Sequence, residues 1–161
     1  MARYTPDGNT LIYWVLSIAN TSAPTVAEIT AGTRVSTHLT RDEGLEIDWD
    51  QKMVEGSSIE ETFDAKDPGT EGVTLKATWF RNLGADTLFT TVFATRNTAG
   101  YWVVRPGVSV DTAIAATQKV EVYPSNMHRA VPVKRTTNTK DKASAAGGIT
   151  ASPVLNATIA A

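Results

Sequence analysis

The stretch from residue 72 to residue 107 constrains the fold most, because it combines two different hydrophobic periods. Apolar and polar residues alternate at residues 73–78, which is the period of a half-buried strand. Residues 101–105 are aromatic and β-branched and predict a second strand. Between them, four apolar residues share one face of a helix: Leu88, Phe89, Val92 and Phe93. We therefore expect strand, short helix and strand, with the helix burying this face against a sheet.

Asp86 stands at the start of the helical segment, which we place at residues 86–95. Its carboxylate can accept hydrogen bonds from free amides one turn further on, so Asp86 is the predicted N-terminal cap. The threonines between the apolar residues are poor helix formers, so packing against the sheet must hold the helix. Gly100 ends the segment, and Pro106 and Gly107 close the strand that follows.

The remaining segments are mostly typical of β structure, because polar and apolar residues alternate or β-branched residues cluster. At 161 residues, the chain is long enough for one domain with its own core. We expect a single mainly β domain, residues 1–161, with one short flanking α-helix. The other predicted elements are strands at residues 11–18, 33–40, 117–123 and 150–160, a helical turn at 25–32 and a turn at 124–127.

Charge is distributed unevenly along the chain. Residues 1–72 hold 13 acidic and 5 basic residues, a balance of −8, whereas residues 73–161 hold 4 acidic and 10 basic residues, a balance of +6. The acids concentrate in a stretch at residues 42–67, which we expect to be a long acidic loop. A connection this long is usually functional or mobile. One interpretation is a solvated acidic surface. The other is that acids and bases lie on different surfaces, through which copies meet head to tail.

Composition excludes several classes of protein. The chain has no cysteine, so disulfides and thiolate chemistry are excluded. No apolar run is long enough to cross a membrane, and the first residues lack the layout of a signal peptide, so we expect synthesis in the cytoplasm. The basic stretch at residues 129–142 has no interleaved aromatic residues, and the overall pI is near 5.7, so sequence-specific nucleic-acid binding is not expected.

No arrangement of residues points to catalysis, a cofactor or a metal ion. The two histidines are far apart in sequence, which argues against a zinc site. Asp48 and Asp50 could bind a hard cation, but the rest of a calcium-loop pattern is missing. Nothing orients the pair Glu60 and Glu61 for glycoside hydrolysis. We expect the protein to have no catalytic residues, no cofactor and no metal, and therefore not to be an enzyme.

Two segments near the N-terminus resemble a known family. These are WVLSIAN at residues 14–20 and PTVAEITAGT at residues 24–33, followed by a strand at 35–39. Together with the central strand, helix and strand, they resemble the major tail tube proteins of long-tailed, non-contractile bacteriophages, the siphovirus type. The resemblance covers most of the chain, to about residue 132, and the end from 135 to 161 matches loosely.

The resemblance implies a β-sandwich or barrel-like tail-tube fold with one flanking helix. It also implies that six copies form a ring and that rings stack into a tail tube in the virion. The tube conducts double-stranded DNA from the capsid to the host without binding it specifically, and it templates on a tape-measure protein. The partners are therefore further copies of the chain and other tail proteins, with no membrane involved.

The expected mechanism is physical. Strands near residues 33–40 and 75–80 join across subunits into an inner sheet, and acids on its lumen face repel the DNA backbone. Which residues face the lumen does not follow from the sequence. The loop at 42–67 reaches the next ring, and residues 134–161 form a C-terminal arm. The candidate interface residues are the apolar anchors Trp49, Met53 and Phe63, the acids Asp48, Asp50, Glu60 and Glu61, and the basic partners Lys134, Arg135, Lys140 and Lys142.

Other functions compatible with the sequence belong to different classes. One is a carbohydrate- or cell-surface-binding β-sandwich, in which exposed tryptophans stack on sugars; the candidates are Trp14, Trp49, Trp79 and Trp102. Within the tube-forming class, the sequence is also compatible with a tail terminator or connector ring and with the tube proteins of contractile tails and secretion systems. Concentration-dependent formation of rings or tubes separates these classes from a sugar-binding monomer.

Overall fold

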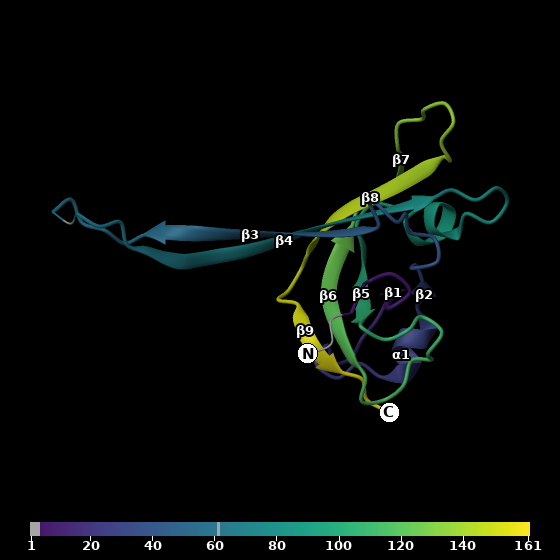
Figure 1. Cartoon of the computed structure of the whole chain (residues 1–161), viewed down its shortest axis with the longest axis horizontal. Coiled ribbons are helices and arrows are strands. Elements are labelled where there is room, and N and C mark those ends of the chain that lie inside the picture. Colours follow the sequence, from purple (N-terminus) through teal and green to yellow (C-terminus); the bar gives the residue numbers. More distant parts are fainter. Residues whose placement is uncertain (1–3, 61) are drawn as a thin grey trace.

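The computed structural model describes residues 4–60 and 62–161 and contains one antiparallel sheet. Its strand order is β2-β1-β5-β6-β8-β4-β3, with β7 added to β8 and β9 added to β6 (Figure 1). The mainly β prediction is confirmed. In chain order, the elements are β1 Thr10–Val15, α1 Val26–Ala31, β2 Thr33–Arg34, β3 Leu45–Glu55, β4 Lys66–Phe80, the π-helical turn η1 Leu88–Val92, β5 Thr98–Pro106, β6 Lys119–Met127, β7 Val131–Pro132, β8 Lys142–Ile149 and β9 Val154–Thr158.

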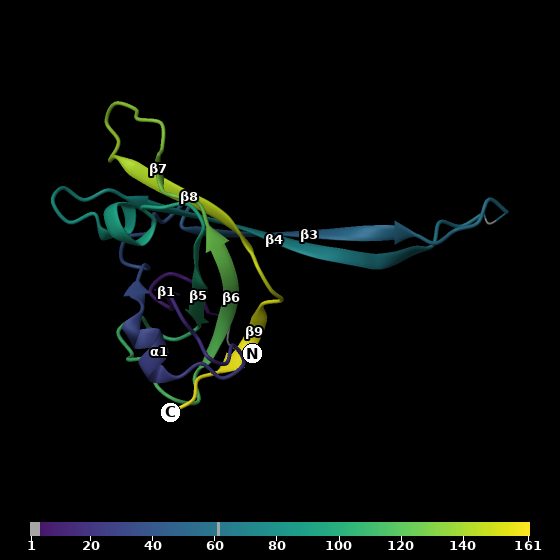
Figure 2. The same cartoon turned by 180° about the vertical axis from the view of Figure 1, so that it is seen from behind.

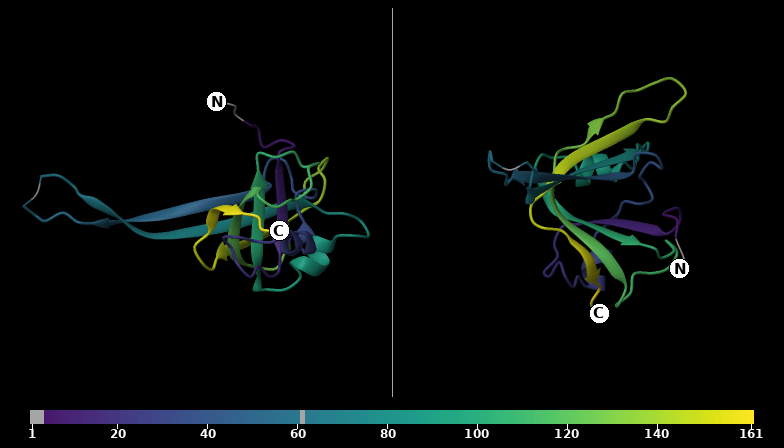
Figure 3. Two further views of the ribbon diagram at one scale, coloured as in Figure 1. Left: turned by 90° about the horizontal axis from the view of Figure 1, so that it is seen from below. Right: turned by 60° about the vertical axis from the view of Figure 1, so that its left-hand side comes forward.

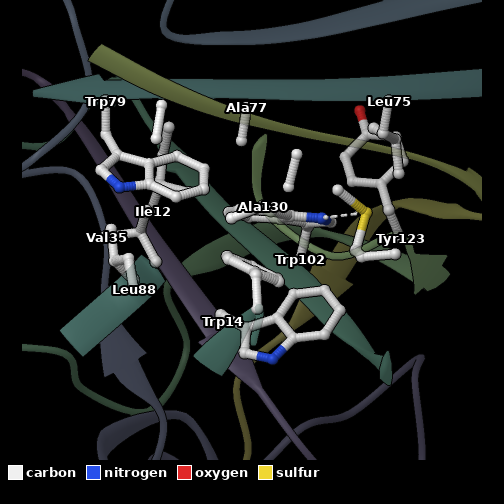
Figure 4. Packing of buried hydrophobic residues seen from close by; sticks show 14 of the residues in the cluster. Ile12, Trp14, Val35, Leu75, Ala77, Trp79, Leu88, Trp102, Tyr123 and Ala130 are labelled. Carbon is white, nitrogen blue, oxygen red and sulfur yellow. Dashed lines mark hydrogen bonds between the residues drawn. The ribbon is translucent and has the colours of Figure 1, made fainter. Parts of the chain in front are cut away.

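The sheet bends back on itself, so its two halves form the layers of a sandwich-like body (Figure 3). Side chains of β1, β5 and β6 meet those of β4 and β8 in one core cluster. Three tryptophans, Trp14, Trp79 and Trp102, are fully buried there (Figure 4). Phe93 is also fully buried, and its ring lies among theirs. The Phe93 ring centroid lies 5.2 Å, 5.7 Å and 5.8 Å from those of Trp14, Trp79 and Trp102 respectively. This aromatic cluster is the centre of the molecule.

A second core covers the opposite face of β1, β5 and β6. Alternation along β5 places Trp102 in the first core and Val103 in the second. Ile29 of α1 and Ile159 near the C-terminus close this second core from outside. These central strands are therefore buried on both faces, which explains their nearly continuous apolar sequence.

Helix α1 confirms the helical turn predicted at residues 25–32. Thr25 and Glu28 form a capping box, in which the Glu28 amide donates to the Thr25 hydroxyl at 3.2 Å and the Thr25 amide donates to the Glu28 carboxylate at 2.8 Å. The Ala19 amide also donates to this carboxylate at 2.8 Å. These amide hydrogen bonds, from Thr25 first and Ala19 second, lower the pKa of Glu28 below its ordinary value.

Glu28→Gln is expected to reduce the free energy of unfolding by about 1 kcal/mol at neutral pH, because one charged acceptor of the capping box is lost. The pKa of Glu28 is lower in the folded than in the unfolded protein. The ionised side chain therefore adds to the free energy of unfolding at pH values above the unfolded-state pKa of Glu28. This contribution is lost as the pH falls through the folded-state pKa. Urea unfolding of both proteins at about pH 7 and about pH 3 measures this. An equal difference at both pH values would contradict the role of the charge.

The helical segment after β4 differs from the prediction in length and in its cap. It is a five-residue π-helical turn, η1, rather than a helix over residues 86–95. The prediction that Asp86 caps it is wrong, because the Asp86 carboxylate instead accepts from the Arg81 side chain at 2.9 Å. Leu88 and Phe93 are buried in the first core, and Phe89 and Val92 pack partly against it. Packing of these side chains holds the turn, as expected for a threonine-rich segment.

Two strand boundaries were wrongly predicted. Residues 33–40 form a strand only at Thr33–Arg34, because the buried Val35 bends the chain and its carbonyl accepts from the amides of His38 and Leu39. Residues 124–127 are not a turn but the end of β6. Pro124 fits within this strand at the place where β6 changes its partner from β9 to β8.

Two longer segments also differ from the sequence prediction. Residues 42–67 are not one continuous loop, because half of them belong to β3 and the start of β4. Residues 134–161 are not a peripheral arm, because β8 lies in the sheet between β4 and β6 and β9 pairs with β6. The small residues Ala143 and Ala145 of β8 are buried opposite Trp79 and Ala77, where a larger side chain would meet the aromatic cluster.

Candidate functional site

Strands β3 and β4 leave the body as a long hairpin (Figures 1 and 2). Their register runs from Leu45 opposite Ala77 to Glu55 opposite Lys66, with one irregularity between Gln51 and Met53. Strand β3 ends the strand order, and within the described residues only β4 pairs with it. Its other edge therefore presents free backbone donors and acceptors, which is the usual template for pairing with another chain.

The base of the hairpin is anchored to the body by apolar side chains. Leu45, Ile47 and Trp49 alternate along β3 and pack against the first core. Trp49 is half-buried and borders a cleft of about 310 Å³ with Ile149 and Pro153. This residue therefore belongs to the base of the hairpin and not to its far end.

Beyond Gln51 the hairpin has no body to pack on, and we call residues 52–70 the distal hairpin. Its apolar side chains are exposed: Met53 by 61%, Val54 by 56%, Ile59 by 104% and Phe63 by 80%. Exposed apolar residues gathered on one projection indicate a surface that another molecule covers. Met53 and Phe63 were predicted here from the sequence, whereas Val54 and Ile59 were not. Val54 and Ile59 could have been selected because they are apolar residues in the same acidic stretch.

Acidic residues accompany these apolar side chains. Glu55, Glu60, Asp64 and Asp67 are exposed and make no ion pair within the part of the chain that the structure describes. The predicted interface residue Glu61 lies outside the described residues. The distal hairpin is therefore both apolar and anionic.

The predicted acids Asp48 and Asp50 occupy a different surface. They lie with Glu46 on the exposed face of β3, opposite Trp49, and we call this side of β3, β4 and β8 the outer face. The Lys76 ammonium lies 3.5 Å from the Glu46 carboxylate there. A shallow groove of about 750 Å³ crosses this face over the small residues Ala146, Gly147 and Gly148, with Asn126 and His128 on its border.

Two of the four predicted basic partners are already paired inside the chain. The Arg135 guanidinium lies 3.0 Å from the Asp141 carboxylate, and this hydrogen bond raises the pKa of Arg135 and lowers that of Asp141. The Lys142 ammonium lies 3.3 Å from the Glu43 carboxylate. Lys140 lies over the Phe80 ring at 5.6 Å, and Lys134 is exposed. Only the last two have no carboxylate partner among the described residues.

Two arginines that sequence reasoning did not select are also exposed and have no ion pair in the described ranges. Arg96 lies in the connection from η1 to β5, and Arg129 lies in the connection from β6 to β7. They line a groove of about 460 Å³ with His128, Val131 and Ala146. Arg129 begins the basic stretch seen in the sequence, whereas Arg96 had no signal because the chain brings it to Arg129 only in the folded state.

The sugar-binding alternative is wrong for three of its four candidate tryptophans. Trp14, Trp79 and Trp102 are buried in the aromatic cluster and cannot stack on a ligand, and Trp49 packs partly on the core. Across residues 4–60 and 62–161, no group of three or more histidine and carboxylate side chains could hold a metal ion. Among the described helices, none has the length and apolar character needed to cross a membrane.

An open edge strand and a projecting hairpin with exposed apolar side chains are typical of a subunit that assembles with further chains. The comparisons with known proteins identify the kind of assembly. The chain matches the phage tail tube protein family over residues 1–161 and therefore belongs to it. It is a structural component of the phage tail and hence of the virion, and the resemblance seen in the sequence is confirmed.

Solved structures support this family on the level of the fold. One is the tail of an empty gene transfer agent particle, refined as a helix with C6 symmetry; 96% of this chain aligns with 100% of that chain at a TM-score of 0.57 and 12% identity. Another is the virion of a native gene transfer agent particle, with 94% and 96% coverage, a TM-score of 0.51 and 11% identity. A search of curated proteins found no match.

Proposed function

We propose that six copies of this chain form a ring, that the rings stack into the tail tube, and that double-stranded DNA passes through it during ejection. The observation that carries this proposal is the projecting hairpin, which has an uncovered apolar and acidic distal part and an open β3 edge. Membership of the tail tube family supports it, as does the likeness to a tail structure with C6 symmetry. The coarser part, self-association of a structural protein, follows from the family.

Within a ring, the open edge of β3 would pair with the sheet of a neighbouring copy. This replaces the sequence-based expectation for residues 33–40, which are too short a strand to carry such pairing. The inner sheet would then consist of β3, β4 and β8, which are neighbours in the strand order and have one exposed face. Closing a sheet across six copies satisfies the backbone groups that an isolated copy leaves open.

In the assembled tube, the outer face of β3, β4 and β8 would point inward and line the channel. It carries Glu46, Asp48 and Asp50 against Lys76, and otherwise small or uncharged residues such as Thr74 and Gly148. Tight binding of DNA depends on cations that neutralise phosphates. A lumen with more acids than bases would therefore let DNA slide without holding it.

Between rings, the distal hairpin would reach a copy in the next ring. Met53 and Phe63 would serve as apolar anchors there, and Lys134 and Lys140 remain available as charge partners. We further propose that the protein acts without catalytic chemistry, and that a tape-measure protein inside the tube is a second partner that sets the number of rings.

Purified protein examined at rising concentration by sedimentation and negative-stain electron microscopy tests the proposal. We expect rings and tubes above a threshold concentration. Rings that never stack would instead favour a terminator or connector ring. Protein that stays single at high concentration and low salt, even with its tape-measure protein present, would overturn the proposed function.

A further inference from the structure

We propose that the distal hairpin of one copy docks in the groove formed by Arg96, His128, Arg129, Val131 and Ala146 on a copy in the next ring. We call this the acceptor groove. The inference rests on the proposed function, since it names the surface that receives the hairpin when rings stack. In this proposal, the principal charge partners of the hairpin are Arg96 and Arg129 and not the basic residues selected from the sequence.

The acceptor groove combines cations with an apolar wall. Arg96 and Arg129 reach it from two different connections of the body, and neither has an ion pair within the described residues. Val131 of β7 contributes an apolar side chain that is 47% exposed. The His128 amide donates to the Ala146 carbonyl at 2.8 Å, which ties the base of the groove to β8. A surface that is both cationic and apolar suits an anionic and apolar partner.

The distal hairpin has the complementary chemistry. Exposed carboxylates of Glu60 and Asp64 stand beside the exposed side chains of Ile59 and Phe63. Guanidinium groups bind carboxylates in a bidentate geometry that fixes orientation as well as charge, which lysines do not do. A Phe63 side chain against Val131, flanked by carboxylates on Arg96 and Arg129, would satisfy both surfaces at once.

The basic residues predicted from the sequence are less suited to this role. Arg135 is already bound by Asp141 and Lys142 by Glu43, so using them would require breaking an existing ion pair. Arg96 and Arg129 require no such exchange. A basic side chain with no ion pair before assembly contributes more to binding than one that must first give up its own carboxylate partner.

A single copy cannot fill its own acceptor groove. The hairpin runs away from the body, whereas the connections that carry Arg96 and Arg129 lie on the body beside β6 and β7 (Figures 1 and 2). The two surfaces are therefore different patches at separate places on one chain. Contact between different patches is heterologous and continues from copy to copy without closing, as the stacking of rings requires.

Charge reversal on both sides tests the docking. Arg96→Glu with Arg129→Glu is expected to raise the threshold concentration for tube formation at least about tenfold, and Glu60→Lys with Asp64→Lys to act similarly, because like charges then face each other. Combining all four changes in one chain should restore most of the lost assembly. Arg34→Glu with Lys119→Glu, which makes the same charge change elsewhere on the body, is the matched control and should assemble normally.

Cysteine cross-linking tests the contact independently of charge, since the chain has no cysteine of its own. Oxidation of tubes carrying Phe63→Cys with Val131→Cys should yield a ladder of linked copies, whereas Phe63→Cys with Leu155→Cys should not. Three results would overturn the acceptor groove alone. The double variant of Arg96 and Arg129 could form tubes at the wild-type threshold concentration, or the four-site variant could fail to recover assembly. The third is a ladder of linked copies that forms only in the Leu155 control. Wild-type protein that never assembles would overturn the proposed function instead.

Discussion

Replacing residues 52–70 by an Asn-Gly turn is expected to give a folded monomer that no longer forms tubes. Gln51 and Glu71 are the last matched pair before the register irregularity, so a two-residue turn can join them. The change removes the exposed apolar and acidic residues of the distal hairpin and keeps Trp49 and Val73, which pack on the body. Removing residues 49–63 would instead damage the core, because Trp49 would be lost.

Electron microscopy and sedimentation measure the loss of assembly, and thermal unfolding followed by circular dichroism verifies the fold. The unfolding midpoint should remain near that of unassembled wild-type protein, because the removed residues bury little surface. Ile59→Ser with Phe63→Ser in the full-length hairpin is the matched control for shape, and it should weaken assembly without removing the strands. Tubes of normal length from the shortened protein would show that the hairpin does not join the rings.

Trp102→Ala is expected to reduce the free energy of unfolding by about 3–5 kcal/mol, the usual cost of removing a buried aromatic side chain and leaving a cavity. Trp102 is fully buried, its ring lies 5.1 Å from that of Trp14, and its Nε1 donates to the Met127 sulfur at 3.4 Å. Domains of this size are stable by only about 5–15 kcal/mol. The variant should therefore lose a large fraction of the stability of the fold.

Denaturant unfolding in the background of the shortened hairpin measures this loss without interference from assembly. Trp49→Ala provides the comparison, because Trp49 is half-buried at the base of the hairpin and should cost clearly less. A loss for Trp102→Ala no larger than that for Trp49→Ala would contradict the central place of the aromatic cluster.

Local sequence patterns predicted two kinds of element: those stabilised by residues close in the chain, and those with a regular pattern of burial. The PTVAEITAG segment predicted α1 because its flanking proline and glycine act within one turn. The structure adds a capping box in the same turn. Alternating residues predicted the second half of β4 and the start of β6, and aromatic and β-branched residues predicted β5. The same patterns misplaced residues 33–40 and 124–127, because a buried Val35 and a change of strand partner at Pro124 are effects of distant neighbours.

The candidate site was predictable in kind but not in detail. The acidic stretch and its apolar residues pointed to an assembly surface, and Met53 and Phe63 are indeed exposed on the distal hairpin. The sequence did not distinguish Trp49 from Met53 and Phe63, because no local pattern marks the point at which β3 stops packing on the core. Likewise, Arg135 and Lys142 have the same sequence character as unpaired bases, and only the folded chain brings Asp141 and Glu43 to them.

By itself, the sequence determined a mainly β chain with its acids and bases separated between two parts of the chain; the family entered only as a resemblance. Residue type and spacing carry that information, because strand period, capping and charge are local properties. The tertiary structure alone decided that the acidic stretch is a projecting hairpin, that β8 fills the middle of the sheet, and that Arg96 meets Arg129. These depend on pairing between residues far apart in the chain, whose register is set by how the aromatic core packs.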